Sequence, residues 1–190
     1  TELLRVVLGM HRAGVIHGDL KIDNCLLRLG DVSPASAWSN LFARDGSAGW
    51  ASKGLTLIDF GRAIDLTAFD DPSQAFIADW DTDAKDCLEM RRGESFTFET
   101  DWFGVAAIAH CLLFGRYMDL THDNHVYKLT SPMKRYWQSE LWNSLFHICL
   151  NPKPRSADGQ TDLQRRPVVF RECQEGPVRL QALSDNGPGK

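Results

Sequence analysis

The chain has 190 residues, a formal net charge of −4 at pH 7 and 43% hydrophobic residues. This length and composition suffice for one domain with a buried core. The acidic balance and the scattered Lys and Arg residues argue against a nucleic-acid-binding face, which needs clustered basic side chains. The longest apolar run, Val105–Phe114, is too short to span a bilayer. We therefore expect one domain without a direct nucleic-acid partner or a membrane contact.

The five cysteines are widely spaced and form no C-x-x-C pair, so neither a zinc knuckle nor a redox motif is indicated. This usage favours a reducing, intracellular compartment. The sequence begins at Thr1, inside a predicted helix and without an apolar leader, so we expect a piece of a longer protein.

In the first part of the chain, apolar residues recur at three- and four-residue spacing over Glu2–Arg12. This pattern predicts an amphipathic helix, which Gly14 ends. Short apolar segments at 25–29 and 55–58 predict two strands. Between them, residues 30–54 are rich in Ser, Gly and Asp but also carry two tryptophans, so we expect an ordered insertion.

Residues 61–100 are polar and irregular, which is typical of a long functional loop. Asp101 is the predicted N-cap of an apolar, central helix over 102–114. A second helical pattern covers 134–150, and the end, 184–190, is expected to be a flexible tail. Together these elements predict a mainly α protein with short β hairpins, an α+β fold.

The strongest motif is H-G-D-L-K-I-D-N at residues 17–24, which has the spacing of the protein-kinase catalytic loop. Phosphoryl transfer depends mostly on positioning and on charge neutralisation, so a few groups at fixed spacing suffice. Asp19 is the predicted acceptor of the substrate hydroxyl proton. Lys21 brings a positive charge to the transferred phosphoryl group, and Asn24 is a predicted magnesium ligand.

A second motif, D-F-G at residues 59–61, follows the predicted strand at 55–58. Asp59 is expected to bind magnesium that bridges the ATP phosphates, Phe60 to pack beneath it, and Gly61 to permit the turn. Turn-capping carboxylates explain each acidic residue singly but not the ordered set. The two motifs together therefore predict a kinase that uses ATP and Mg²⁺.

Two further motifs sharpen this prediction. C-L-E-M at 87–90 stands where kinases usually have A-P-E, and D-W-F-G at 101–104 stands where an Asp braces the catalytic loop. With I-D-F-G-R-A-I-D and F-G-R-Y-M, these motifs resemble the Bub family of mitotic spindle-checkpoint kinases, and the insertion 30–54 resembles its fungal members. The resemblance covers about residues 1–150.

The resemblance implies the carboxy-terminal lobe of a serine/threonine protein kinase over residues 1–183, with its activation segment at 59–89. It also implies a nuclear, kinetochore location and a checkpoint or chromatin protein as substrate. Other checkpoint proteins would bind through regions outside this chain. The glycine loop and lysine of a nucleotide-binding lobe are not in this sequence. We therefore expect the chain alone to be inactive.

Three departures from the usual kinase pattern stand out. Gly18 replaces the Arg that grips an activation-loop phosphate in many kinases, and Ile22 and Leu88 each replace a Pro. Glu89 is expected to form a buried ion pair. Its arginine partner stays open between three candidates: Arg155, Arg165 and Arg166.

Two other functions remain possible on sequence grounds. Small-molecule phosphotransferases of the aminoglycoside or choline kinase kind also use an H-G-D…N loop, but Lys21, the D-F-G motif and Glu89 followed by an Asp-capped helix favour a protein kinase. A non-catalytic checkpoint pseudokinase, acting as a binding module, is the other alternative. Retention of the four chemical side chains argues against it: Asp19, Lys21, Asn24 and Asp59.

Overall fold

The computed structural model describes residues 2–28, 54–71, 74–124 and 126–152. The predicted tail 184–190, the insertion 30–54 apart from Gly54, and the three candidate partners of Glu89 lie outside the described residues. The elements in chain order are α1 (Glu2–Arg12), β1 (Val15–Ile16), η1 (Ile22–Asn24), β2 (Cys25–Arg28), β3 (Gly54–Leu57), β4 (Ile64–Asp65), η3 (Leu66–Ala68), α2 (Leu88–Arg91), α3 (Glu99–Phe114), β5 (Leu120–Asp123), β6 (Val126–Leu129) and α4 (Ser139–Leu150).

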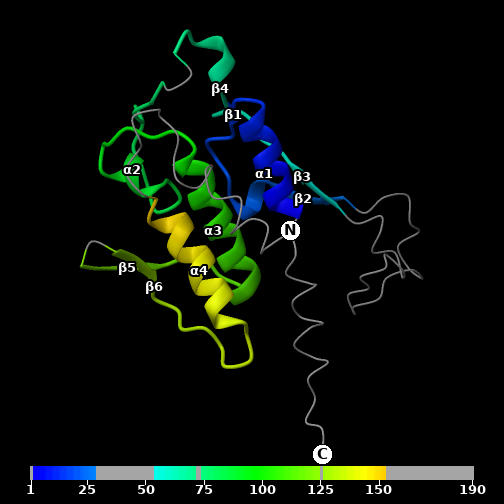
Figure 1. Cartoon of the computed structure of the whole chain (residues 1–190), viewed down its shortest axis with the longest axis vertical. Coiled ribbons are helices and arrows are strands. Elements are labelled where there is room, and N and C mark those ends of the chain that lie inside the picture. The colour runs from blue at the N-terminus through cyan, green and yellow to red at the C-terminus, as the bar shows by residue number, and fades with distance from the viewer. Residues whose placement is uncertain (1, 29–53, 72–73, 125, 153–190) are drawn as a thin grey trace, which may run out of the picture.

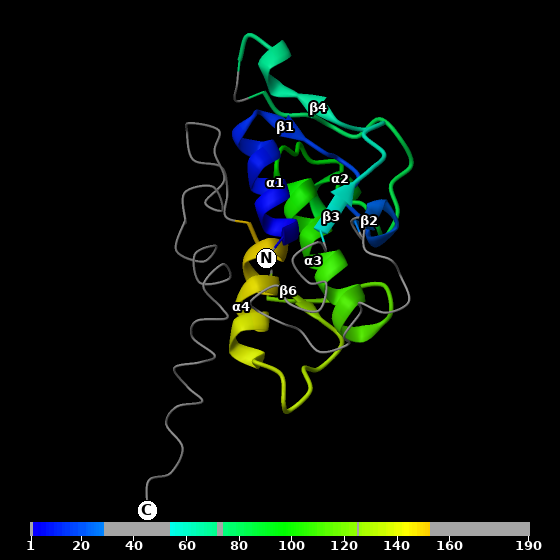
Figure 2. The ribbon, with the colours of Figure 1, turned by 90° about the vertical axis from the view of Figure 1, so that its right-hand side faces the viewer.

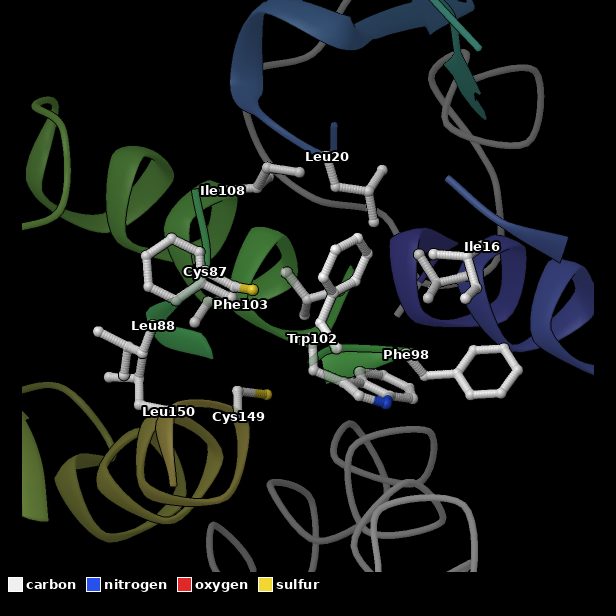
Figure 3. Close-up of a cluster of buried hydrophobic side chains, with 14 of the residues drawn as sticks. Ile16, Leu20, Cys87, Leu88, Phe98, Trp102, Phe103, Ile108, Cys149 and Leu150 are labelled. Carbon is white, nitrogen blue, oxygen red and sulfur yellow. The ribbon is translucent and has the colours of Figure 1, made fainter. Parts of the chain in front are cut away.

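Helix α3 is the centre of the lobe, and both α1 and α4 pack against it (Figures 1 and 2). Because neighbours cover most of its circumference, it is apolar nearly all round, as the sequence predicted. Trp102, Phe103 and Ile108 of α3 join residues of α4 and of the loop before α3 in one buried cluster (Figure 3). The hydrophobic core of the lobe is therefore built around this helix.

The predicted helix at Glu2–Arg12 is confirmed, but two other predicted helix starts are wrong. Helix α3 begins at Glu99 with Phe98 as N-cap, so Asp101 lies in the first turn. Its carboxylate accepts hydrogen bonds from another segment and is not used to cap its own helix. Helix α4 begins at Ser139, and residues 134–138 form turns instead of the predicted first helical turn.

The strands pair in three separate two-stranded antiparallel sheets, β1–β4, β2–β3 and β5–β6. In the second sheet, Cys25 is opposite Leu57 and Arg28 is opposite Gly54. The β5–β6 hairpin was not predicted. Its turn contains Asn124 with a φ of 48°, a left-handed conformation that Asn tolerates. The predicted mainly α fold with short hairpins is confirmed.

A glycine allows the segment after β1 to lie directly on α3. A Cβ atom on Gly104 would be 2.3 Å from the Cβ and 2.5 Å from the carbonyl oxygen of Leu20. No side chain fits in that space, so the backbone of residues 17–24 rests on the helix itself. Leu20 is buried there beside α3 (Figure 3).

None of the helices in the described part of the chain combines the length and the apolar character that crossing a membrane requires.

Candidate active site

The predicted catalytic loop, residues 17–24, is held in place by the carboxylate of Asp101, a residue in the first turn of α3 that is 0% exposed. The backbone N–H groups of His17 and Gly18 donate to its two oxygens at 2.8 and 2.9 Å. The ring Nε2 of His11, on α1, is 2.8 Å from the same carboxylate. One buried carboxylate thus joins α1, the catalytic loop and α3. The bracing role that the family resemblance assigned to Asp101 agrees with these contacts.

His17 connects the catalytic loop to the D-F-G motif. Its ring accepts a hydrogen bond at Nδ1 from the N–H of Asp19 (3.3 Å) and donates from Nε2 to the carbonyl oxygen of Ile58 (3.1 Å). These two partners select the neutral tautomer with its proton on Nε2. The ring of Phe60 packs on His17 with the centroids 4.6 Å apart. Phe60 is still 49% exposed, so only part of it is packed as predicted.

Three of the predicted site residues are in direct contact. Lys21 Nζ lies 2.6 Å from Asp19 Oδ2, and Asn24 Nδ2 donates to the same oxygen at 3.1 Å and to the Asp19 carbonyl at 2.9 Å. Both side-chain bonds reach Oδ2. Among the described residues no hydrogen bond to Oδ1 of Asp19 is seen, and the carboxylate therefore keeps one oxygen for a ligand.

Asp59 reaches the same region through the β2–β3 hairpin. The pair of Cys25 and Leu57 ends the ladder, and the N–H of Ile58 donates to the carbonyl oxygen of Asn24 at 3.0 Å. Asp59 then takes a left-handed backbone conformation with a φ of 62°. Such a conformation is uncommon for a residue with a side chain and concentrates at functional sites. It turns the chain immediately after the strand, and the Asp59 side chain is exposed.

These donors fit a magnesium ion bound together with a nucleotide. Mg²⁺ prefers oxygen ligands and is usually held by one or two carboxylates plus substrate phosphates and water. Asp59 offers an exposed carboxylate, and Asn24, whose Nδ2 is used by Asp19, keeps its amide oxygen. In the described residues no group of three His, Cys, Asp or Glu side chains could hold a metal ion.

Glu89, in α2, lies close to a guanidinium group, although not to one that the sequence suggested. Arg92 Nη2 is 3.8 Å from Glu89 Oε1, but the same atom donates to Glu94 at 2.7 Å. Burial, the largest cause, raises the pKa of Glu89 above its ordinary value. The pair with Arg92 is therefore loose, and the candidates Arg155, Arg165 and Arg166 lie outside the described residues.

Two contributions to the site do not follow from the motifs. His11 lies at the spacing of the apolar residues of α1, and this predicted burial is the available signal, because a buried His needs a polar partner. The second is an ion pair between Arg62 and Asp86, whose Nη1 and Oδ1 atoms are 3.0 Å apart. No local pattern indicates this pair, because 24 residues separate its members in the sequence.

Comparisons with known proteins agree with this geometry. The chain is 47% identical over 155 residues to the "Spindle assembly checkpoint serine/threonine-protein kinase bub1" of Schizosaccharomyces pombe, across 80% of the chain and 15% of that protein. It is 39% identical over 169 residues to the corresponding BUB1 kinase of Saccharomyces cerevisiae, across 88% of the chain and 16% of that protein. No family model matches.

The crystal structure of the BubR1 kinase domain superposes with a TM-score of 0.65 at 27% sequence identity, across 97% of the chain and 51% of that domain. The chain thus spans about half of a solved kinase domain and 15% and 16% of the length of the two curated relatives. The part that matches is the helix-rich lobe described above. Over most of its length, the chain is thus a homologue of the Bub1 checkpoint serine/threonine protein kinases.

Proposed function

We propose that this chain supplies the substrate- and magnesium-binding half of a serine/threonine protein kinase active site. The observation that carries the proposal is the arrangement around Asp19. Its Oδ2 is held by Lys21 and Asn24, while Oδ1 has no partner among the described residues. A general base needs a fixed carboxylate with a free oxygen, and this arrangement provides both.

In the proposed reaction, the hydroxyl oxygen of a protein Ser or Thr attacks the γ-phosphorus of ATP. The bond from that phosphorus to the β–γ bridging oxygen breaks, ADP leaves with the bond's electrons, and the hydroxyl proton passes to Asp19. Lys21 is close enough to Asp19 to add positive charge where the phosphoryl group moves. Asn24 and Asp59 would hold magnesium, which when bound neutralises phosphate charge.

Large apolar side chains near these groups in the sequence are exposed. Leu26 and Leu27 of β2 are 50% and 74% exposed, and Phe60 is 49% exposed. Successive residues of a strand point to opposite faces, so Leu26 and Leu27 belong to different surfaces of the β2–β3 sheet. We infer that the nucleotide-binding lobe of the kinase covers part of this exposed apolar surface.

The cellular setting follows from the names of the relatives. Since those proteins are spindle-checkpoint kinases, we propose that this chain acts in the same checkpoint, in the nucleus and at kinetochores, on checkpoint or chromatin proteins. Contacts with other checkpoint proteins would then be made by regions outside this chain.

The test requires a protein in which this chain is joined to a nucleotide-binding lobe. Asp19→Asn removes the proton acceptor but keeps the size of the side chain, and such groups contribute about 10²–10⁴ in rate. Asp59→Asn should lower the rate at least as much. The control is Asp123→Asn, because Asp123 lies on the β5–β6 hairpin in an exposed pair with Lys128. Near-normal phosphate incorporation into protein by the Asp19 or Asp59 variant would refute the assignment.

The chain by itself should bind ATP–Mg²⁺ weakly and transfer no phosphate. Its own residues contact only the magnesium and the transferred group, while in kinases a glycine-rich loop and a lysine of the other lobe hold the remaining phosphates. Calorimetry on the purified chain should therefore detect no saturable binding in the micromolar range. Tight binding would mean that the nucleotide sits elsewhere.

A further inference from the structure

Residue 18 is unable to carry a side chain in this structure. Gly18 has a φ of 77°, in the left-handed region, and a Cβ atom there would be 2.5 Å from the carbonyl oxygen of Arg62. The backbone of Arg62 therefore occupies the space next to the catalytic loop. An arginine at position 18, as in kinases that grip a loop phosphate, is incompatible with this packing.

The side chain of Arg62, the residue directly after the D-F-G motif, contacts the later part of the activation segment. Its Nη1 donates to Asp86 Oδ1 at 3.0 Å, and its guanidinium carbon lies 4.6 Å from the centroid of the Trp80 ring. Asp86 is only 9% exposed, and its other oxygen accepts the N–H of Asp83 at 2.9 Å. One arginine thus contacts both the middle and the end of the segment.

The end of the segment is anchored in the core. Cys87, directly after Asp86, is buried, as are Leu88 and Met90 of α2. The middle is held by a second device, because Phe76 and Phe96 exchange backbone hydrogen bonds of 3.0 and 2.8 Å. Between them and the catalytic loop lies a pocket of about 480 Å³, and Arg62 and Trp80 line it.

We propose that Arg62, Trp80 and Asp86 form an arginine clasp that positions the activation segment. In this clasp the Asp86 carboxylate has the role that an activation-loop phosphate has in other kinases. A guanidinium binds a carboxylate and a phosphate with the same charge-assisted hydrogen bonds. A built-in carboxylate makes the clasp independent of phosphorylation. The proposal rests on the proposed kinase function but concerns how this segment is held, which is measurable without activity.

Hydrogen–deuterium exchange on the purified chain tests the clasp directly. Arg62→Ala should speed exchange in residues 76–86 by about tenfold, equivalent to about 1.4 kcal/mol of local stability. Asp86→Asn, which preserves the size of the side chain, should act in the same direction. The control is Arg5→Ala, which removes an exposed arginine paired with Glu2 on α1 and should leave the segment unchanged.

Two further variants separate a specific clasp from general loss of packing. The double variant Arg62→Ala with Asp86→Asn should lose little more protection than either single variant, because both changes remove the same ion pair. Arg62→Lys keeps the positive charge but loses the planar guanidinium. Residues 76–86 should therefore be less protected from exchange than in the wild type, but more protected than in Arg62→Ala. Unchanged exchange in both Arg62→Ala and Asp86→Asn, or fully additive losses in the double variant, would overturn the proposal.

In the protein that carries both lobes, phosphatase treatment should leave the turnover of protein substrate unchanged, and Arg62→Ala should raise KM for that substrate. A large loss after phosphatase that rephosphorylation restores would overturn the clasp as the holding device. Complete absence of phosphate transfer in the unmodified protein, with the exchange results as expected, would refute the proposed function and leave the clasp as a structural feature.

Discussion

The predicted catalytic loop (17–24) and the predicted activation segment (59–89) contact each other at Gly18 and Arg62, but they are held in different ways. The catalytic loop is fixed by a fully buried carboxylate, that of Asp101, through two backbone N–H groups and a buried histidine. The activation segment depends on a guanidinium, that of Arg62, which is 42% exposed.

This difference shows how the lobe separates rigid from adjustable parts. A hydrogen bond to a buried charge is costly to break, because the partner left behind keeps its desolvation penalty. A half-exposed ion pair is screened by water, and its loss costs much less. The loop that bears Asp19 and Asn24 is therefore expected to keep its geometry under conditions in which the activation segment opens.

The largest effect should come from Asp101→Ala. The change leaves two buried N–H groups and the ring of His11 without their partner, and each buried polar group left unsatisfied costs about 1–3 kcal/mol. Urea denaturation of the purified chain measures this loss. Asp101→Asn keeps one acceptor oxygen and should lose less. A loss below about 1 kcal/mol for the Ala variant, the size of an ordinary hydrogen bond, would contradict the idea of a rigid loop.

A smaller loss is expected from Gly104→Ala, which tests the packing of the loop on α3. The new Cβ would overlap Leu20, and overpacking of a core typically costs about 1–3 kcal/mol. Gly9→Ala in α1 is the matched control, because nothing lies within 4 Å of its Cβ position. That change should stabilise the helix by about 0.5–1 kcal/mol. Equal effects of both changes on the free energy of unfolding would show that the close approach is unimportant.

The acid stability of α3, which carries Asp101, should depend on His110. Burial lowers the pKa of His110 from its ordinary 6.5, against an opposing hydrogen bond to the carbonyl oxygen of Arg116. The unfolded chain therefore takes up a proton near pH 6.5, while the folded chain does so only at lower pH. The stability present above pH 6.5 is lost progressively as the pH falls through this window.

His110→Gln should make the free energy of unfolding depend less on pH between about 7 and 5. Asn143→Gln, at an exposed position of α4 without an ionisable group, is the control and should keep the pH dependence of the wild type. Parallel pH profiles for the wild type and the His110 variant would show that this histidine does not titrate differently in the folded chain.

The smallest effect is expected at Thr67, a hydroxyl of the activation segment. Its Oγ1 donates to Asp65 Oδ1 at 2.6 Å, in an exposed turn. Thr67→Ala should change the free energy of unfolding by no more than about 0.5 kcal/mol, as surface substitutions usually do. It should also leave the exchange of residues 76–86 unaltered. A marked rise in exchange there would show that the segment depends on this hydroxyl and not on the arginine clasp alone.

The sequence alone determined the features that depend on local spacing. The 17–24 motif predicted that the side chains of Asp19, Lys21 and Asn24 lie close together, because at most five positions of a tight loop separate them. The period of apolar residues predicted α1 and the central position of α3. The family resemblance then assigned the bracing role to Asp101. The chemical roles of Asp19, Lys21 and Asn24 stay predictions.

Tertiary structure decided the features that join distant segments. Asp101 and His11 meet across 90 residues, and Arg62 and Asp86 across 24, distances at which no sequence period applies. Its residue type predicted Asp101 as the N-cap of its own helix. In the structure its carboxylate instead accepts hydrogen bonds from the backbone N–H groups of His17 and Gly18. Gly18 appeared as a lost arginine in the sequence. Only the position of the Arg62 carbonyl shows that a side chain has no room there.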